Sequence, residues 1–177
     1  MSDQIAQRVR AATREVPDFP SIGIGFKDIT PVLADAALTA DAIGAMSGPF
    51  EHEAISHVVA IESRGFIFGM PIALRLGASF VPARKPGKLP WKTVSESYAL
   101  EYRADVLEMH QDALGAGARV LIVDDVLATG GTAAAAARLV TQLGGVVVAL
   151  TVLSELTFLG ARERLPFPIH SLVRYDV

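Results

Sequence analysis

The 177-residue chain contains no cysteine. Disulfide bonds, a cysteine nucleophile and cysteine-ligated metals are therefore excluded. The absence of cysteine also suits a reducing compartment. We expect a cytoplasmic protein.

Long apolar runs and blocks of like charge are also missing. No run of apolar residues approaches the roughly 20 that a helix needs to span a bilayer. Residues 1–13, MSDQIAQRVRAAT, lack the apolar core of a signal peptide. The formal net charge is −3, without a cluster of Lys or Arg. This balance argues against nucleic acid or an anionic membrane as a partner.

What the chain does have is a repeated strand–turn–helix–strand pattern. Residues 57–85, HVVAIESRGFIFGMPIALRLGASFVPARK, form one such unit. Residues 120–140, VLIVDDVLATGGTAAAAARLV, begin a second, and VVVALTVL over 146–153 completes it. Continuous apolar strands that alternate with helices are typical of a parallel sheet covered on both faces. We predict a single α/β domain with a mostly parallel central sheet flanked by helices.

Other segments give weaker patterns. Apolar residues at helical spacing predict a helix near the N-terminus and another from about residue 36. Alternating apolar and polar residues predict a strand over 105–110. Residues 17–31, rich in proline and glycine, are expected to form an ordered irregular segment or a short strand. Residues 86–103 are interpreted as a long loop that enters a strand near Tyr98.

Two adjacent aspartates, Asp124 and Asp125, come where the strand over 120–123 is expected to end. In parallel α/β sheets, ligands bind outside the carboxyl ends of the strands. Adjacent carboxylates repel each other, and burying both without partners is costly. The two O–H donors of a vicinal sugar diol would match them. The pair is therefore interpreted as a sugar-diol site.

The turn LATGGT follows the aspartates and opens a helix near Gly131. The first N–H groups of a helix lack partners and carry a partial positive charge. Glycine lets a ligand approach the backbone closely, and Thr129 and Thr132 add hydroxyl donors. These features predict a phosphate site without a lysine. A diol beside a phosphate matches ribose 5-phosphate.

Simpler interpretations account for less of this string. A lone Asp before a helix is more often only a cap, but a cap needs neither two acids nor two glycines. A Walker B strand needs a partner G-x-x-x-x-G-K-[ST], which the chain lacks. The segment GIGFKD fails at the last position of the dinucleotide-binding fingerprint.

A second anion site is predicted at ESRGF, after the strand over 57–61. The guanidinium of Arg64 suits phosphate, and Gly65 opens the following helix. Alone, this string would be interpreted as a surface turn with a solvated arginine. Beside the first site on the same sheet edge, it indicates a sugar with phosphate at both ends.

VLIVDDVLATGGT resembles the phosphoribosyl pyrophosphate motif of the type I phosphoribosyltransferases. Over residues 17–160, five strings occur in the order and spacing of the adenine phosphoribosyltransferase family: PDFPSIGIGFKDITPVL, ESRGFIFG, RKPGKLP, SYALEY and VDDVLATGGT. The resemblance implies one domain over 1–177 with a small N-terminal base-binding hood and a flexible loop. It also implies a homodimer.

The resemblance also implies an activity. The family transfers ribose 5-phosphate from phosphoribosyl pyrophosphate to adenine, giving AMP and pyrophosphate in purine salvage. Mg²⁺ would be held largely by substrate oxygens and water, because this ion dehydrates reluctantly. No protein residue is assigned as a metal ligand.

Site residues follow from the resemblance, position by position. The ribose 5-phosphate residues, within a motif over 120–140, would be Asp124, Asp125, Ala128, Thr129, Gly130, Gly131 and Thr132. The pyrophosphate residues, in a loop where the family has a cis non-proline peptide, would be Glu62, Ser63 and Arg64, with Arg84, Lys85 and Lys88. The base-binding residues, on segments 17–31 and 155–160, would be Ile24, Phe26, Lys27 and Leu159. Glu101, in a flexible loop over 85–103, would be the catalytic acid/base.

Two residues depart from the family pattern. Lys27 stands where arginine is common, and Arg103 stands where glycine is usual. The sequence leaves open whether these changes alter base reading or loop closure. Two other functions also stay open: a related enzyme for hypoxanthine, guanine or xanthine, and a non-catalytic sensor of phosphoribosyl pyrophosphate. FPSIGIGFKD favours adenine, and the lack of a basic stripe argues against a DNA-binding sensor.

Overall fold

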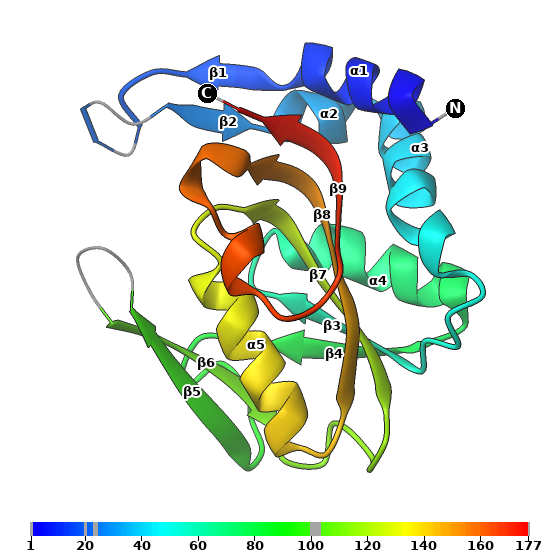
Figure 1. The fold of residues 1–177 in the computed structure, drawn as a ribbon, viewed down its shortest axis with the longest axis vertical. Helices are drawn as coiled ribbons and strands as arrows, with labels where there is room; N and C mark the ends of the chain where they lie inside the picture. Colours follow the sequence, from blue (N-terminus) through cyan, green and yellow to red (C-terminus); the bar gives the residue numbers. More distant parts are fainter. Residues whose placement is uncertain (1, 20, 23–24, 100–103, 177) are drawn as a thin grey trace.

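A sheet of five parallel strands forms the centre of the molecule (Figure 1). The computed structural model describes residues 2–19, 21–22, 25–99 and 104–176. The strand order is β4-β3-β7-β8-β9, and every neighbouring pair is parallel. The strands are β3 (His57–Ile61), β4 (Ser79–Ala83), β7 (Arg119–Leu127), β8 (Val146–Leu156) and β9 (Ile169–Tyr175). The predicted α/β fold with a parallel sheet is confirmed.

Helices cover both faces of this sheet. The predicted crossover helices are α4 (Gly65–Leu76), between β3 and β4, and α5 (Gly131–Gln142), between β7 and β8. The N-terminal part adds α1 (Ser2–Ala12), α2 (Thr30–Ala34) and α3 (Ala36–Ser47), followed by the short helix η1 (Gly48–Phe50). Helices α1 and α3 confirm the two helices predicted from spacing. Among the described residues, none of the helices combines the length and apolar character that a membrane span requires.

Two separate hydrophobic clusters lie on the two faces, which explains why the strands are apolar throughout. On β7, Val120 and Ile122 pack in the cluster that includes α5, whereas Leu121 and Val123 pack in the cluster that includes α1, α3 and α4. All four are fully buried. Because successive side chains of a strand point to opposite faces, each cluster takes every second residue.

A two-stranded hairpin lies apart from the central sheet and corrects one prediction. Residues 86–103 were expected to be a long loop that enters a strand near Tyr98, but the strand is longer: β5 runs over Thr93–Ala99. It pairs antiparallel with β6 (Ala104–His110), from Thr93 opposite His110 to Ala99 opposite Ala104. The residues of β5 are mostly polar, so the partner strand rather than a buried face identifies it. The predicted strand over 105–110 is confirmed.

Three further strands or extensions were not predicted. Strand β1 (Arg14–Val16) was not predicted; it pairs antiparallel with β2 (Phe26–Asp28), the short strand that was one of the two expectations for residues 17–31. Strand β9 forms one edge of the central sheet. Strand β7 continues through Asp124 and Asp125 to Leu127 instead of ending at residue 123. In each case the pairing with a partner strand, rather than the composition of the segment, defines the strand.

Candidate active site

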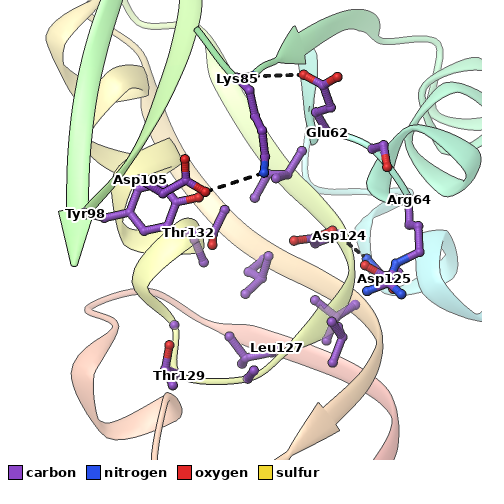
Figure 2. Close-up of a pocket in the computed structure, with 18 residues that line it drawn as sticks. Glu62, Arg64, Lys85, Tyr98, Asp105, Asp124, Asp125, Leu127, Thr129 and Thr132 are labelled. Atoms are coloured by element: carbon purple, nitrogen blue, oxygen red, sulfur yellow. Dashed lines mark hydrogen bonds and ion pairs between the residues drawn. The ribbon is translucent and has the colours of Figure 1, made fainter. Parts of the chain in front are cut away.

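A cavity of about 700 Å³ opens at the carboxyl ends of β3 and β7 (Figure 2). Its lining includes most residues predicted for ribose 5-phosphate, namely Asp124, Asp125, Ala128, Thr129, Gly130 and Thr132. It also includes four residues predicted for pyrophosphate, namely Glu62, Ser63, Arg64 and Lys85. The two predicted anion turns therefore face one cavity. Gly131, Arg84 and Lys88 are not among its lining residues.

The two aspartates lie on a part of β7 that has a neighbouring strand on one side only. Strand β3 pairs with β7 as far as Val123, whereas β8 pairs with it as far as Leu127. Asp124 and Asp125 are therefore inside the strand but beyond the last pair with β3. The prediction that they follow the strand was wrong, but their place at the edge of the cavity is as expected.

The two carboxylates differ in their partners. Asp125 is 5% exposed, and its Oδ2 lies 2.7 Å from Nε of Arg64. Asp124 accepts a hydrogen bond at Oδ1 from the backbone N–H of Asp125, at 2.9 Å. Burial and the neighbouring charge of Asp125 raise the pKa of Asp124 well above its usual value, and the charge of Arg64 offsets only part of this. Without substrate, the site therefore holds a carboxylate, Asp124, that hydrogen bonds donated by a ligand would stabilise.

The turn before α5 depends on a glycine. Gly130 has φ of +84°, a conformation that side-chain-bearing residues rarely adopt. A Cβ at this position would also lie 3.2 Å from Cβ of Ala161. Because the residue at the N-cap position has no side chain, it cannot itself satisfy the first N–H groups of α5. This arrangement supports an anion site at the turn.

The ESRGF turn packs closely against β7. A Cβ on Gly65 would lie 2.9 Å from the carbonyl oxygen of Val123 and 3.0 Å from Oδ1 of Asp124. Only glycine allows this approach without a shift, and it brings the turn beside the aspartates. The Glu62–Ser63 peptide bond is cis, as the resemblance implied.

Arg84, one of the cations predicted for pyrophosphate, pairs with Glu62. Glu62 accepts hydrogen bonds from Nη2 of Arg84 at 2.8 Å, from Nε of Arg84 at 3.2 Å and from the backbone N–H of Lys85 at 2.9 Å. The bonds from Arg84 hold the pKa of Glu62 below its usual value. Nη1 of Arg84 donates to the carbonyl oxygen of Lys88 at 2.9 Å. These contacts fix the side chain of Arg84 next to the cavity.

Two residues from the hairpin also line the cavity, and sequence reasoning missed both. Nζ of Lys85 lies 3.6 Å from Oδ2 of Asp105, and Tyr98 is buried beside them (Figure 2). Burial and the carboxylate of Asp105 raise the pKa of Tyr98, while a hydrogen bond with Thr132 opposes this shift. The pairing of β5 with β6 brings Tyr98 opposite Asp105, and only the register reveals it.

On the predicted base side, Phe26 lies close to the cavity but does not line it. Its ring packs edge-to-face with Phe19 at 5.1 Å, and the guanidinium of Arg64 lies 5.2 Å from its centre. The ammonium of Lys27 instead contacts Glu15 at 2.7 Å and the ring of Tyr175 at 4.9 Å. This side chain has its own partners away from the cavity, so its change from arginine does not alter the cavity lining.

The remaining predicted residues are outside this cavity or outside the described residues. Leu159 is half-buried in the short helix η2 (Thr157–Leu159), and it does not line the cavity. Ile24, Glu101 and Arg103 lie outside the described residues. Within the described part of the chain, no group of three or more His, Asp or Glu side chains is placed to hold a metal ion.

Comparison of the sequence and the fold with known proteins gives the family to which the chain belongs. Residues 31–163 match the phosphoribosyl transferase domain family. The chain therefore belongs to the phosphoribosyltransferases. An adenine phosphoribosyltransferase from Myxococcus xanthus is 59% identical over 157 residues, which cover 89% of this chain and 85% of the relative.

Solved structures of adenine phosphoribosyltransferases are similar over nearly the whole chain. The enzyme from Rhodothermus marinus has a TM-score of 0.92 and 53% identity, covering 97% of this chain and 99% of its own. The enzyme from Saccharomyces cerevisiae, complexed with D-2,5-dideoxy-2,5-imino-altritol 1,6-bisphosphate and adenine, has a TM-score of 0.90 and 40% identity, covering 96% and 98%.

Proposed function

We propose that this chain is an adenine phosphoribosyltransferase, which transfers ribose 5-phosphate from phosphoribosyl pyrophosphate to adenine and forms AMP and pyrophosphate. One observation carries the proposal: the paired aspartates and the two turns predicted to bind anions face a single cavity. That arrangement suits a sugar with a diol and phosphate at both ends. The names of the similar enzymes support adenine as the base.

On the ribose side, Asp124 and Asp125 would accept hydrogen bonds from the two ring hydroxyls. The 5-phosphate would bind at residues 128–132, where the N–H groups and partial positive charge of the start of α5 favour an anion. Bond breaking leaves positive charge at the anomeric carbon, and the nearby carboxylates stabilise that charge. The same residues thus bind the substrate and favour its reactive state.

On the pyrophosphate side, Arg64, Lys85, Arg84 and Lys88 would neutralise the leaving group. Arg84 and Lys85 already lie beside Glu62 and Asp105, which hold them near the cavity. Mg²⁺, when bound with the substrate, would supply positive charge to the phosphate oxygens. The carboxylate oxygens of Asp124 have the hard donor chemistry that suits this ion or its water shell.

On the base side, adenine would stack between Phe26 and Leu159, and backbone near Ile24 and Lys27 would read its edge. The side-chain contacts of Lys27 with Glu15 and Tyr175 support a backbone role for this position. Glu101 would exchange a proton with the base or hydrogen-bond to its ring nitrogen. This role rests on the resemblance alone.

A panel of bases tests the proposed function. The wild-type protein would be incubated with phosphoribosyl pyrophosphate and, in turn, adenine, hypoxanthine, guanine and xanthine, with and without Mg²⁺. We expect AMP formation with adenine and Mg²⁺, and far less product in the other mixtures. Preferred use of another base would contradict the adenine assignment. Substrate binding without any product would favour the sensor function instead.

Replacing Asp124 with Asn should stabilise the free protein at neutral pH while weakening phosphoribosyl pyrophosphate binding. A carboxyl whose folded pKa is raised binds its proton more tightly in the folded state. Folding stability is therefore lost as pH rises from the unfolded pKa, about 3.9, through the raised folded pKa. Asn keeps an oxygen to accept from Asp125 N–H but carries no charge, so it removes this loss.

The measurement is the melting temperature of both proteins without ligand as a function of pH, with calorimetric titration of phosphoribosyl pyrophosphate and Mg²⁺. The Asn variant should melt higher at neutral pH, and the difference should shrink as the pH falls. Binding should weaken by about tenfold or more, since hydrogen bonds to charged groups contribute roughly 1.5–3 kcal/mol. A lower melting temperature together with wild-type affinity would contradict both assignments.

We also propose a homodimer, located in the cytoplasm. Helix α4 exposes three large apolar side chains at helical spacing, Ile67, Met70 and Leu74, with exposed fractions of 41%, 46% and 69%. The three positions share one face of the helix, and contiguous apolar surface of this kind often marks a protein interface. Light scattering should give the mass of two chains. The mass of one chain would contradict the dimer.

A further inference from the structure

The carboxylate of Glu155 is buried near the end of β8 and does not line the cavity. The residue is 2% exposed. Arg162 donates to it twice, from Nε to Oε1 at 3.1 Å and from Nη2 to Oε2 at 2.6 Å. Oγ of Ser171 donates to Oε2 at 2.5 Å, and Nε of Arg174 lies 3.3 Å from the same oxygen. A charged, fork-shaped contact of this kind fixes orientation as well as distance.

The environment keeps this carboxylate ionised. Burial alone would raise the pKa of Glu155, but hydrogen bonds from Arg162 and Ser171, with the charges of Arg162 and Arg174, hold it below its usual value. Removing the charge would leave Arg162 and Arg174, whose side chains are partly exposed, without the buried acceptor that they share. The cluster therefore depends on Glu155.

Arg162 connects the segment 157–165 to two strands. It begins the short helix η3 (Arg162–Arg164), and its Nη1 also donates to the carbonyl oxygen of Ile169 at 2.9 Å. At the start of the segment, Oγ1 of Thr157 donates to the carbonyl oxygen of Tyr175 at 3.0 Å. The segment is thus attached to both ends of β9: Arg162 bonds to Ile169, the first residue of the strand, and Thr157 bonds to Tyr175, the last.

The same segment reaches both halves of the proposed site. It carries Leu159, which is assigned to the base. Ala161 is 3% exposed and lies against Gly130 of the phosphate turn, and Nη1 of Arg164 donates to the carbonyl oxygen of Thr129 at 3.4 Å. In Figure 1 this segment, drawn in orange, follows β8 and lies beside the start of α5. The segment therefore joins the residue assigned to the base to the turn assigned to the phosphate.

We propose that the Glu155–Arg162 pair is a positioning device, which holds segment 157–165 so that Leu159 and the phosphate turn keep a fixed separation. The inference rests on the proposed function, because the base and the phosphate are the two ends of one nucleotide. Glu155 touches neither end. It acts through the segment that Arg162 anchors.

The test compares a ligand that spans both halves with a ligand that occupies one. Dissociation constants of AMP and of ribose 5-phosphate would be measured by calorimetric titration for the wild type and for Glu155→Gln. AMP gains affinity because its two ends bind at a matched spacing, and that gain depends on geometry. We expect the Kd of AMP to rise about tenfold or more and that of ribose 5-phosphate to change less than about threefold, as loss of matched spacing predicts.

Thr151→Val is the matched control. Thr151 lies on the same strand, is fully buried, and donates a hydrogen bond from Oγ1 to the carbonyl oxygen of Met46 at 3.1 Å. Its removal loosens the core without touching segment 157–165, so the ratio of the two constants should stay at the wild-type value. If Glu155→Gln does not fold, Arg162→Lys takes its place. This variant keeps the charge but loses the two-pronged guanidinium contact, so the Kd of AMP divided by that of ribose 5-phosphate should rise.

The outcomes separate the two proposals. Equal weakening of both ligands, or a wild-type ratio in Glu155→Gln and Arg162→Lys, would overturn the positioning role while leaving the enzyme assignment intact. Failure of the wild-type protein to bind AMP would instead overturn the proposed function, and the positioning role with it. A ratio that rises in Thr151→Val as well would show general loosening and would also overturn the inference.

Discussion

Replacing Gly130 with Val is expected to abolish binding of the 5-phosphate in a protein that still folds. Gly130 has φ of +84°, and a Cβ there would lie 3.2 Å from Cβ of Ala161. A β-branched side chain is strained in this conformation and adds atoms at the turn that must approach the phosphate. The turn must shift, so its N–H groups no longer converge on an anion. Losses above about 10²-fold are expected from such misplacement.

The measurement is the affinity for ribose 5-phosphate and for AMP, with the fold checked by circular dichroism. Gly117→Val is the matched control, because Gly117 has φ of +75° and open space around its Cβ position. That variant carries similar backbone strain far from the proposed site, so it should bind both ligands normally. Unchanged binding in a folded Gly130→Val protein would show that the 5-phosphate binds elsewhere.

Replacing Glu101 with Gln should lower kcat by about 10²–10⁴-fold, the usual contribution of general acid–base catalysis. The reason lies in the reaction. In the proposed reaction, the cationic side chains and Mg²⁺ would stabilise the pyrophosphate leaving group, so that side would need no protein acid. Adenine attacks through N9, and its ring proton must be moved. A carboxylate can accept the proton or redistribute ring charge by hydrogen bonding, whereas Gln keeps the shape but cannot transfer a proton in this way.

Steady-state kcat and direct binding of adenine and AMP would be measured for both proteins. Binding should change little compared with kcat. Glu96→Gln is the control, because Glu96 lies on β5 and pairs with Arg138 at 2.9 Å. It disturbs the hairpin without removing the proposed acid/base. A kcat within about threefold of the wild type, far below the range for acid–base catalysis, would contradict the acid/base role of Glu101.

The sequence predicted those parts of the fold whose pattern is local. The β3–α4–β4 and β7–α5–β8 units follow from apolar strands, glycine turns and helical spacing within about 30 residues, the usual size of a βαβ unit. The start of β5 was placed too late and β9 was missed, because their partner strands, not their own composition, define them. The extension of β7 past Asp125 was missed for the same reason, since β8 supplies its hydrogen bonds.

The site residues fall into the same two groups, those predicted from the local sequence and those that only the packing reveals. Asp124, Arg64 and the Gly130 turn were predicted because each comes after an apolar run in the sequence and the carboxyl ends of parallel strands meet at one edge. Tyr98 and Asp105 entered the cavity lining only through the register of the hairpin. The contact between Arg64 and Asp125, which were predicted for different parts of the substrate, also came from packing rather than from spacing.

The two hydrophobic clusters on opposite faces of β7 restrict where a residue can be inserted into the chain. A one-residue insertion within Val120–Val123 would send every later side chain of the strand to the other face. The two clusters would exchange residues, and Asp124 would turn away from the cavity. An insertion near Gly115 or Gly117, where a side chain would meet open space, would shift neither cluster. Length variation is therefore tolerated in this turn and excluded from the strand that follows it.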